Sequence, residues 1–242
     1  MIIAAVRSVV TYVAVSVYVL FAASIGMLLE MIFRWKGILY ILGHGGVRLG
    51  LALAGIKVRV VGREHLPLDR AAVYCANHES NVDPPVLFTS LHPRMHIVYK
   101  AEINAIPLLA RAFQHGGFVP IERRNKEAAM RSLEAGARSI QSGNSFLIFP
   151  EGTRSKTGEM LPFKKGGFLM ALKAQAPIVP VAISGGRDAM RRGSAIIRPV
   201  TVSIRVGTPI ETAGMQMSDR DELIARVRSA IEALLAEGPV VD

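Results

Sequence analysis

Cysteine is nearly absent from this sequence, because Cys75 is the single one among 242 residues. One cysteine excludes a disulfide within the chain and any zinc site built from several cysteines, and it is compatible with a reducing compartment. We interpret Cys75 as a small buried residue of a β-strand. Function must therefore come from other side chains.

The histidines do not form a recognisable metal site. The dipeptide His78-Glu79 could begin a zinc-protease motif, but Val82 stands where the second histidine would be. His92 and His96 have i, i+4 spacing, yet Pro93 interrupts any helix between them, so we expect both histidines in a solvent-facing loop. The sequence predicts no metal ligand and no cofactor.

Acidic and aromatic residues are both scarce. Asp and Glu number 19 against 29 Lys and Arg, which gives a formal net charge of +10. Such a charge favours an anionic partner, whether nucleic acid, an acidic membrane surface or a phosphorylated substrate. Aromatic residues amount to 6% and are not interleaved with basic ones as in RNA-binding folds. We predict no nucleic-acid partner; a basic protein that binds lipid at a membrane surface without catalysis stays an alternative.

Charge is missing altogether from residues 8–29. As a helix this run would measure about 33 Å, against a hydrocarbon core of about 30 Å. We therefore predict an N-terminal membrane helix that crosses the bilayer. A cleaved signal peptide is the competing interpretation. However, Arg7 alone is a weak basic region for a signal peptide, and the apolar run is longer than the hydrophobic region of a usual signal peptide. Arg34 and Lys36 follow the span, which places the main domain on the cytoplasmic side of the inner membrane.

A second apolar stretch covers residues 37–55 but contains His44, Arg48 and several glycines. We expect an interfacial or re-entrant helix, with an ordinary first helix of the globular domain as the alternative. The predicted organisation is thus membrane-associating helices over residues 1–55 and a catalytic domain over 56–242.

From residue 57 onward, short β-rich runs alternate with helical ones, which is typical of an α/β domain. We predict a single mixed sheet with helices on both faces. The expected strands are 57–61, 72–76, 96–99, 117–120, 146–149, 178–182 and 201–206. Helices are expected between them, including one over 103–113, one that starts after Asn125 as its N-cap, and a last one that opens at Ser218.

The first polar loop, residues 77–85, follows an apolar strand and contains His78 and Asp83. Histidine titrates near neutrality, and a carboxylate five residues later can hold its second ring nitrogen across a turn. Such a pair is a general base for a hydroxyl group. The chain has no G-x-S-x-G motif to supply its own nucleophile, so we favour direct attack by a hydroxyl of the substrate.

A second polar loop, residues 149–155, also follows an apolar strand. Glu151, Gly152, Thr153 and Arg154 would together suit a phosphate monoester, through charge-assisted bonds from Arg154 and close backbone approach at Gly152. Further cations stand at strand ends or before a helix: Lys100, Arg123 and Lys164. Each is ordinary surface when taken alone, but together they predict an anion site.

Four ordered segments resemble the motif blocks of the glycerolipid acyltransferase family. They are Asn77-His78-x-Ser80-x-x-Asp83, Gly117-Phe118-Val119-Pro120-Ile121-Glu122-Arg123, Phe149-Pro150-Glu151-Gly152-Thr153-Arg154-Ser155 and Val179-Pro180-Val181. Glu122 stands where aspartate is common in the family. Because the second block helps to set acceptor choice, this departure leaves the acceptor less certain than the reaction.

The resemblance implies an O-acyltransferase in which His78 is the general base and Asp83 orients it. It also implies that Arg123, Glu151, Gly152 and Arg154 bind a glycerol phosphate. Asn77, Ser80 or a backbone amide would support the oxyanion, and the sequence leaves these three alternatives open. The expected donor is acyl-CoA or acyl-carrier protein, the expected acceptor is the sn-2 hydroxyl of 1-acyl-glycerol-3-phosphate, and the product is phosphatidic acid. Another lysophospholipid or a lyso-ornithine lipid is the alternative acceptor.

Overall fold

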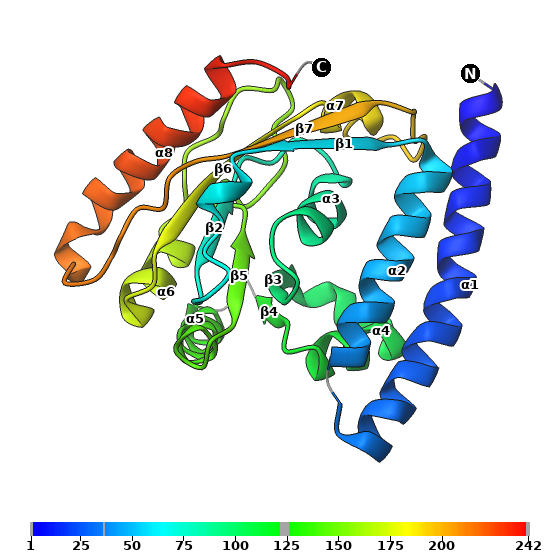
Figure 1. Ribbon diagram of the computed structural model, residues 1–242, viewed down its shortest axis with the longest axis horizontal. Coiled ribbons are helices and arrows are strands. Elements are labelled where there is room, and N and C mark those ends of the chain that lie inside the picture. The colour runs from blue at the N-terminus through cyan, green and yellow to red at the C-terminus, as the bar shows by residue number, and fades with distance from the viewer. Residues whose placement is uncertain (1, 36, 122–125, 241–242) are drawn as a thin grey trace.

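The structure, a computed structural model, describes residues 2–35, 37–121 and 126–240. Seven strands form one sheet in the order β1-β7-β6-β2-β5-β3-β4 (Figure 1). Their bounds are β1 Lys57–Val61, β2 Val73–Ala76, β3 Met95–Lys100, β4 Val119–Ile121, β5 Ser145–Ile148, β6 Ile178–Ser184 and β7 Thr201–Val206. All seven expected strands are present, with ends that differ by two residues at most.

The sheet is mixed, as predicted. β6 and β7 pair antiparallel, whereas the other neighbouring strands pair parallel. The largest shift in the start of a strand is at β4, which begins at Val119 rather than Gly117. Gly117 has a φ of 77°, and Phe118 N–H bonds to the Phe113 carbonyl, so both residues belong to the preceding turn.

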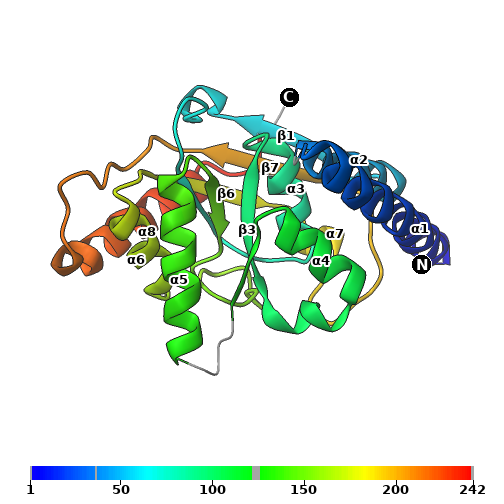
Figure 2. The ribbon, with the colours of Figure 1, turned by 90° about the horizontal axis from the view of Figure 1, so that it is seen from below.

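Helices cover both faces of the sheet (Figures 1 and 2). The helices are α1 Ile2–Phe33, α2 Gly37–Ala54, α3 Asp83–Ser90, α4 Pro107–His115, α5 Lys126–Gln141, α6 Gly166–Ala174, α7 Gly186–Ala189 and α8 Arg220–Ala236. Alternate residues of β2 face opposite cores: Tyr74 packs with α2 and α3, and Cys75 packs with α5, α6 and α8. Cys75 is fully buried, as predicted.

Three helix boundaries differ from expectation or fall outside the described chain. The last helix begins at Arg220 instead of Ser218, because Met217–Asp219 forms a 3-10 turn that a Gln216–Asp219 capping box closes. The expected helix over 103–113 is a 3-10 turn followed by α4, since Pro107 suits only the first turn of a helix. Asn125 lies outside the described residues, and α5 follows it from Lys126.

The interpretation of His96 as a solvent-facing loop residue is wrong. His96 lies in β3 and is 6% exposed, with its ring stacked on Phe146 at 5.1 Å between centroids. Its Nε2 lies 3.0 Å from the hydroxyl of Tyr40 on α2. Burial lowers the pKa of His96 to about 4, so the ring is neutral at physiological pH. His92 is half-buried.

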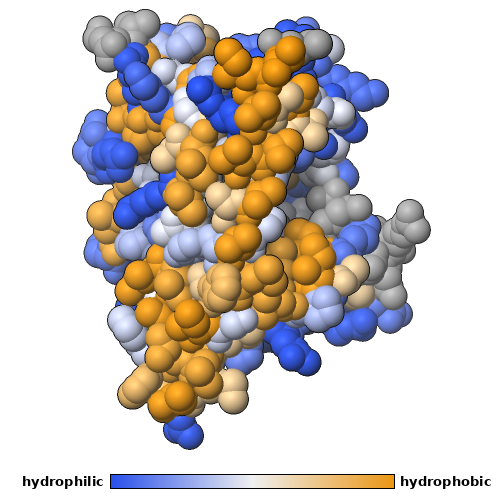
Figure 3. All heavy atoms as spheres, turned by 90° about the vertical axis from the view of Figure 1, so that its right-hand side faces the viewer, coloured by the Kyte–Doolittle hydropathy of each residue, from blue (hydrophilic) through white to orange (hydrophobic). Residues whose placement is uncertain are grey.

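The two N-terminal helices run antiparallel beside each other and pack on one side of the domain (Figure 1). Both are long and apolar enough to cross a membrane by length and composition. Figure 3 shows a band of hydrophobic side chains over this side of the molecule. Exposed members of the band on α1 include Val6, Val13, Leu20, Phe21, Leu28 and Phe33. An apolar surface of this size is unusual on a protein surrounded only by water.

Candidate active site

The two polar loops meet at one edge of the sheet. β2 and β5 are parallel neighbours, with Val73 opposite Phe146 and Cys75 opposite Ile148. Their carboxyl ends therefore lie side by side, and the chain enters both loops from the same edge. This topology brings His78 against residues 149–155, although about 70 residues separate the two loops in sequence.

His78 and Asp83 form a hydrogen-bonded pair. His78 Nδ1 lies 2.9 Å from Asp83 Oδ2. The same carboxylate oxygen accepts the backbone N–H groups of Glu79 and Ser80, each at 2.7 Å. Asp83 is completely buried at the start of α3, whereas the His78 side chain is 15% exposed. Because Asp83 occupies Nδ1, Nε2 is the ring nitrogen left to meet a substrate.

The second loop holds the backbone of His78 on both sides. Glu151 is buried, and its Oε1 accepts His78 N–H at 2.8 Å while its Oε2 accepts Leu161 N–H at 2.9 Å. Ser155 N–H in turn donates to the His78 carbonyl at 2.8 Å. The ring of Phe149 stacks on the imidazole at 4.1 Å. These contacts fix the position of the ring, and burial raises the pKa of Glu151.

Asn77 and Ser80 are also buried, and each side chain is bonded to the backbone. Asn77 donates to the Ile183 carbonyl at 2.9 Å and accepts Ile183 N–H at 2.8 Å, which joins the end of β2 to β6. The Ser80 hydroxyl donates to the Met190 carbonyl at 2.8 Å. With these partners, neither side chain is directed at an open site.

Several expected anion ligands surround the second loop. Gly152 has a φ of 66°, and a Cβ placed on it would lie 2.9 Å from Lys164 Nζ, so the lysine rests directly over this glycine. The guanidinium of half-buried Arg154 has no ion pair within the described part of the chain, and Thr153 is exposed. Lys100 ends β3, but its side chain is outside the described residues. Arg123 lies outside them entirely.

Glu79 is an additional titratable group beside the pair. Burial, and next the charge of Asp83, raise the pKa of Glu79 to about 7, although a bond from Arg187 N–H opposes the shift. The carboxyl group is therefore half protonated near neutral pH. The raised pKa of Glu79 carried no signal in the sequence, because its largest cause is burial, which exists only in the folded chain.

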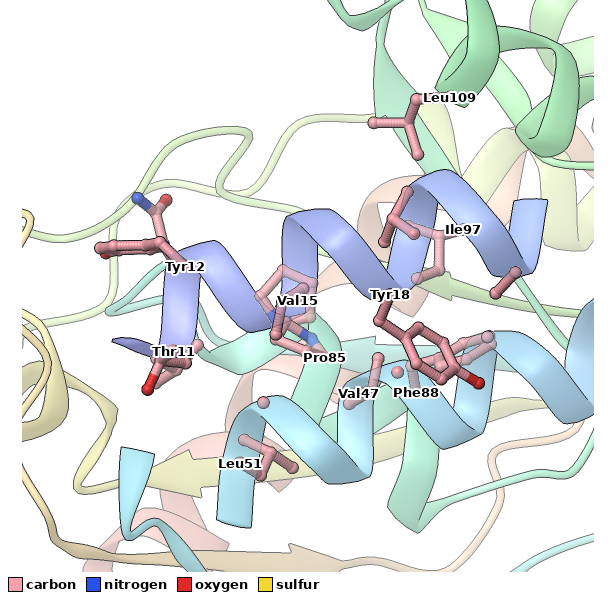
Figure 4. A pocket seen from close by; sticks show the side chains of 18 of the residues that line it. Thr11, Tyr12, Val15, Tyr18, Val47, Leu51, Pro85, Phe88, Ile97 and Leu109 are labelled. Carbon is pink, nitrogen blue, oxygen red and sulfur yellow. The ribbon is translucent and has the colours of Figure 1, made fainter. Parts of the chain in front are cut away.

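An apolar cavity of about 690 Å³ opens beside the His78 loop. Figure 4 shows Val15 and Tyr18 of α1, Val47 of α2 and Phe88 of α3 around it. Asn81 and Val82, from the turn between His78 and Asp83, also line it, and so does Ala112 of α4. The volume falls within the range of about 300 to 1,000 Å³ typical of ligand sites.

The cavity walls were only partly visible in the sequence. α1 was interpreted from the sequence only as a membrane segment, yet it lines the cavity together with α2, α4 and residues between Met190 and Ile197. The structure places all of these segments around one space. Within residues 2–35, 37–121 and 126–240, no group of three or more His, Cys, Asp or Glu side chains could hold a metal ion.

Comparisons with known proteins agree with the motif resemblance. The family described as Acyltransferase matches residues 57–184. A 1-acyl-sn-glycerol-3-phosphate acyltransferase of Limnanthes douglasii is 30% identical over 221 residues, which cover 89% of this chain and 78% of the relative. The corresponding enzyme of Cocos nucifera is 35% identical over 178 residues, or 73% and 56% of the two chains.

A solved structure has the same fold over the full length. The crystal structure of the 1-acyl-sn-glycerophosphate acyltransferase of Thermotoga maritima superposes with a TM-score of 0.87. It covers 100% of this chain and 99% of that one at 23% identity. The likeness therefore extends to the two N-terminal helices as well as the sheet.

Proposed function

The chain belongs to the acyltransferase family, and from that premise we propose that it acylates the sn-2 hydroxyl of 1-acyl-glycerol-3-phosphate to give phosphatidic acid. The acyl donor is a thioester of coenzyme A or of acyl-carrier protein. The observation that carries the proposal is the His78–Asp83 pair, in which a buried carboxylate holds Nδ1 and leaves Nε2 for the acceptor hydroxyl. The names of the relatives favour this acceptor over a lyso-ornithine lipid.

In this mechanism His78 Nε2 takes the proton of the acceptor hydroxyl as its oxygen attacks the thioester carbonyl. The buried charge of Asp83 stabilises the imidazolium that forms. The tetrahedral intermediate then collapses, the carbon–sulfur bond breaks, and the departing sulfur takes the proton from His78. No acyl-enzyme is needed, because the substrate supplies the nucleophile.

We assign the remaining motif residues to two roles. Arg154 and Lys164, with the close backbone approach at Gly152, bind the phosphate of the acceptor. Glu151, Asn77 and Ser80 position the base, since their polar atoms are bonded to backbone groups of the two loops. Arg123 and Lys100 keep their predicted phosphate role as part of this proposal.

The apolar cavity is the place for a fatty-acyl chain, because it starts at the turn that carries the base and is lined almost entirely by hydrocarbon. Ala112→Phe would fill its end near α4. We expect this variant to favour acyl donors shorter than those that the wild type prefers, measured by competition between donors of different length. Gln114→Phe, on the exposed side of the same helix, is the matched control, and an unchanged preference in Ala112→Phe would place the chain elsewhere.

We further propose that α1 and α2 attach the enzyme to one leaflet, in place of the bilayer crossing that the sequence predicts for α1. α1 is bonded to the domain near both of its ends: Ser8 accepts Ile197 N–H at 2.8 Å, and Glu30 lies 3.0 Å from His115 Nδ1. These ends are about 33 Å apart along the helix. A helix held in this way lies along the domain, and its apolar side enters the lipid from one surface.

The test of function is acyl transfer from labelled acyl-CoA and acyl-carrier protein to a panel of lysolipids, with membranes that contain the wild type, His78→Ala or Asp83→Ala. We expect diacyl product from 1-acyl-glycerol-3-phosphate, and a loss of turnover of about 10³-fold or more in His78→Ala. Normal turnover in His78→Ala refutes the assignment of the base. Product from another lysolipid alone moves the proposal to that acceptor.

Arg154→Ala separates binding from chemistry in the same assay. Because Arg154 would contact the phosphate and not the reacting atoms, we expect the KM for the acceptor to rise about 10-fold or more with a smaller change in kcat. Arg131→Ala, in which an exposed cation on α5 is removed, controls for the loss of positive charge. If both variants bind the acceptor equally well, Arg154 is not a phosphate ligand.

A further inference from the structure

One oxygen of the Asp83 carboxylate lies against a glycine from another part of the chain. Asp83 Oδ2 accepts three hydrogen bonds, whereas Oδ1 is buried without a hydrogen-bond partner in the described part of the chain. Gly186, the first residue of α7, lies directly against Oδ1. A Cβ on Gly186 would overlap Asp83 Oδ1 far inside van der Waals contact and would also lie 3.2 Å from Ser80 Cβ.

The reason for glycine at this position is space and not backbone conformation. The φ angle of Gly186 is outside the left-handed region, unlike that of Gly185 at 89°. An L-residue could therefore adopt the backbone conformation of position 186 without strain. Only the carboxylate of Asp83 and the side chain of Ser80 exclude a larger residue.

Hydrogen bonds on both sides of Gly186 hold this segment in place against Asp83. Upstream, Ile183 exchanges two hydrogen bonds with the Asn77 side chain. Downstream, the Met190 carbonyl accepts the Ser80 hydroxyl, and Met190 N–H donates to the Gly186 carbonyl at 3.0 Å. Gly186 itself is buried. An added methyl group would therefore displace the carboxylate rather than the α7 backbone, and the three bonds to Oδ2 would be strained together.

We propose that Gly186 is a positioning residue for the general base: the absence of its side chain sets where the Asp83 carboxylate lies and hence how the His78 ring is oriented. The effect on turnover rests on the acyl transfer proposed above. The steric part does not, because it depends only on the contact between Gly186 and Asp83. The two parts can be tested separately.

A double-mutant cycle tests the contact without any activity. We expect Gly186→Ala to lower the Tm by about 3 to 10 °C, the range for overpacking in a chain of this length. Asp83→Ala vacates the space, so Gly186→Ala made in that background is expected to cause less than half of this loss. If Gly186→Ala alone does not fold, recovery of folding in the double variant is the supporting result. Equal losses in both backgrounds, or a double variant no better folded than Gly186→Ala, overturn the proposal.

Kinetics test the consequence for the base. In Gly186→Ala we expect kcat to fall about 10- to 100-fold while the KM for the lysolipid changes less than about two-fold. Gly136→Ala is the matched control, because a Cβ there overlaps the Met170 side chain in the core, far from the base. It should lower the Tm but leave kcat unchanged. Equal kcat values in Gly186→Ala and Gly136→Ala overturn the positioning role.

A spectroscopic measurement tests the geometry of the His78–Asp83 pair without relying on acyl transfer. The Nδ1–H of His78 bonded to Asp83 should give a downfield proton resonance, assigned by its absence in His78→Ala. We expect Gly136→Ala to keep that resonance and Gly186→Ala to lose or shift it. If the wild type transfers no acyl group, the proposed function fails, yet the resonance and the cycle still decide on Gly186. A resonance unchanged in Gly186→Ala overturns the inference even in an active enzyme.

Discussion

At the residue scale, two carboxyl groups four residues apart have different environments. Asp83 is satisfied by the imidazole and two backbone N–H groups through one oxygen. Glu79 is half-buried beside that charge, and the pKa of Glu79 is raised to about 7. Like charges close together in a buried site disfavour a second ionisation. One carboxylate is thus bonded to His78, and the neighbouring carboxyl group is half protonated near neutral pH.

Glu79→Gln should alter how stability depends on pH. The ordinary pKa of a glutamate side chain is 4.5, so between about pH 4.5 and 7 folded Glu79 keeps a proton that the unfolded chain releases, and stability falls as pH rises. Glu79→Gln has no titrating group at this position, so it does not lose stability in this way. We expect its free energy of unfolding to exceed that of the wild type by a margin that grows to at most about 3 kcal/mol above pH 7.

Chemical denaturation at several pH values measures this difference. Glu64→Gln, at an exposed position, controls for the change from carboxylate to amide and should follow the wild type. Parallel curves for Glu79→Gln and the wild type would show that burial does not hold the proton on Glu79.

At the scale of elements, α1 is joined to the domain by polar contacts within an otherwise apolar surface. Ser8 is buried, accepts Ile197 N–H and donates to the Ala4 carbonyl at 2.7 Å. The Tyr12 hydroxyl donates to the Ala195 carbonyl at 2.8 Å. These contacts hold α1 against residues that line the cavity. The helix therefore lines the cavity and also carries part of the exposed apolar surface.

Ser8→Ala should weaken the attachment of α1 to the domain. The change leaves the buried Ile197 N–H without a partner, which costs about 1 to 3 kcal/mol. We expect a Tm lower by about 2 to 8 °C in detergent or nanodiscs. Ser24→Ala is the matched control, because the exposed Ser24 hydroxyl donates to the Leu20 carbonyl of its own helix. If the two variants melt together, the Ser8 contact does not hold α1 to the domain.

At the scale of the whole molecule, the helices that carry the apolar band also line the cavity. α1 and α2 form one side of the domain, and the cavity lies between these helices, α3 and α4 (Figure 4). Under the proposed function, this arrangement lets an acyl chain pass from lipid to the proposed base without crossing bulk water. The net charge of +10 adds attraction to anionic lipid.

The orientation of α1 can be tested by labelling. Cys75 is buried, so single cysteines at Ile2 and Trp35, both exposed, can be labelled selectively with a membrane-impermeant maleimide. If α1 lies on one leaflet, we expect both sites to react from the same side of sealed vesicles. If α1 crosses the bilayer, the two sites react from opposite sides, and the proposal for α1 is wrong.

The succession of strands along the chain, the mixed α/β class and the pairing of His78 with Asp83 could all be predicted from the amino-acid sequence. These features depend on hydrophobic periodicity, on turn signals and on a spacing of five residues, all of which are local. The 149–155 loop could likewise be placed at a strand end, but the order of the strands, and so the neighbours of this loop, could not be derived from the sequence.

The buried groups that hold those loops became visible only in the folded chain. The bonds of Asn77 to Ile183, of Ser80 to Met190 and of Ser8 to Ile197 join residues at least 106 positions apart. The place of Gly186 against Asp83 and the cavity between α1 and α4 depend on the same packing. Local propensity cannot specify such contacts, because they form only when several elements are brought together by one shared core.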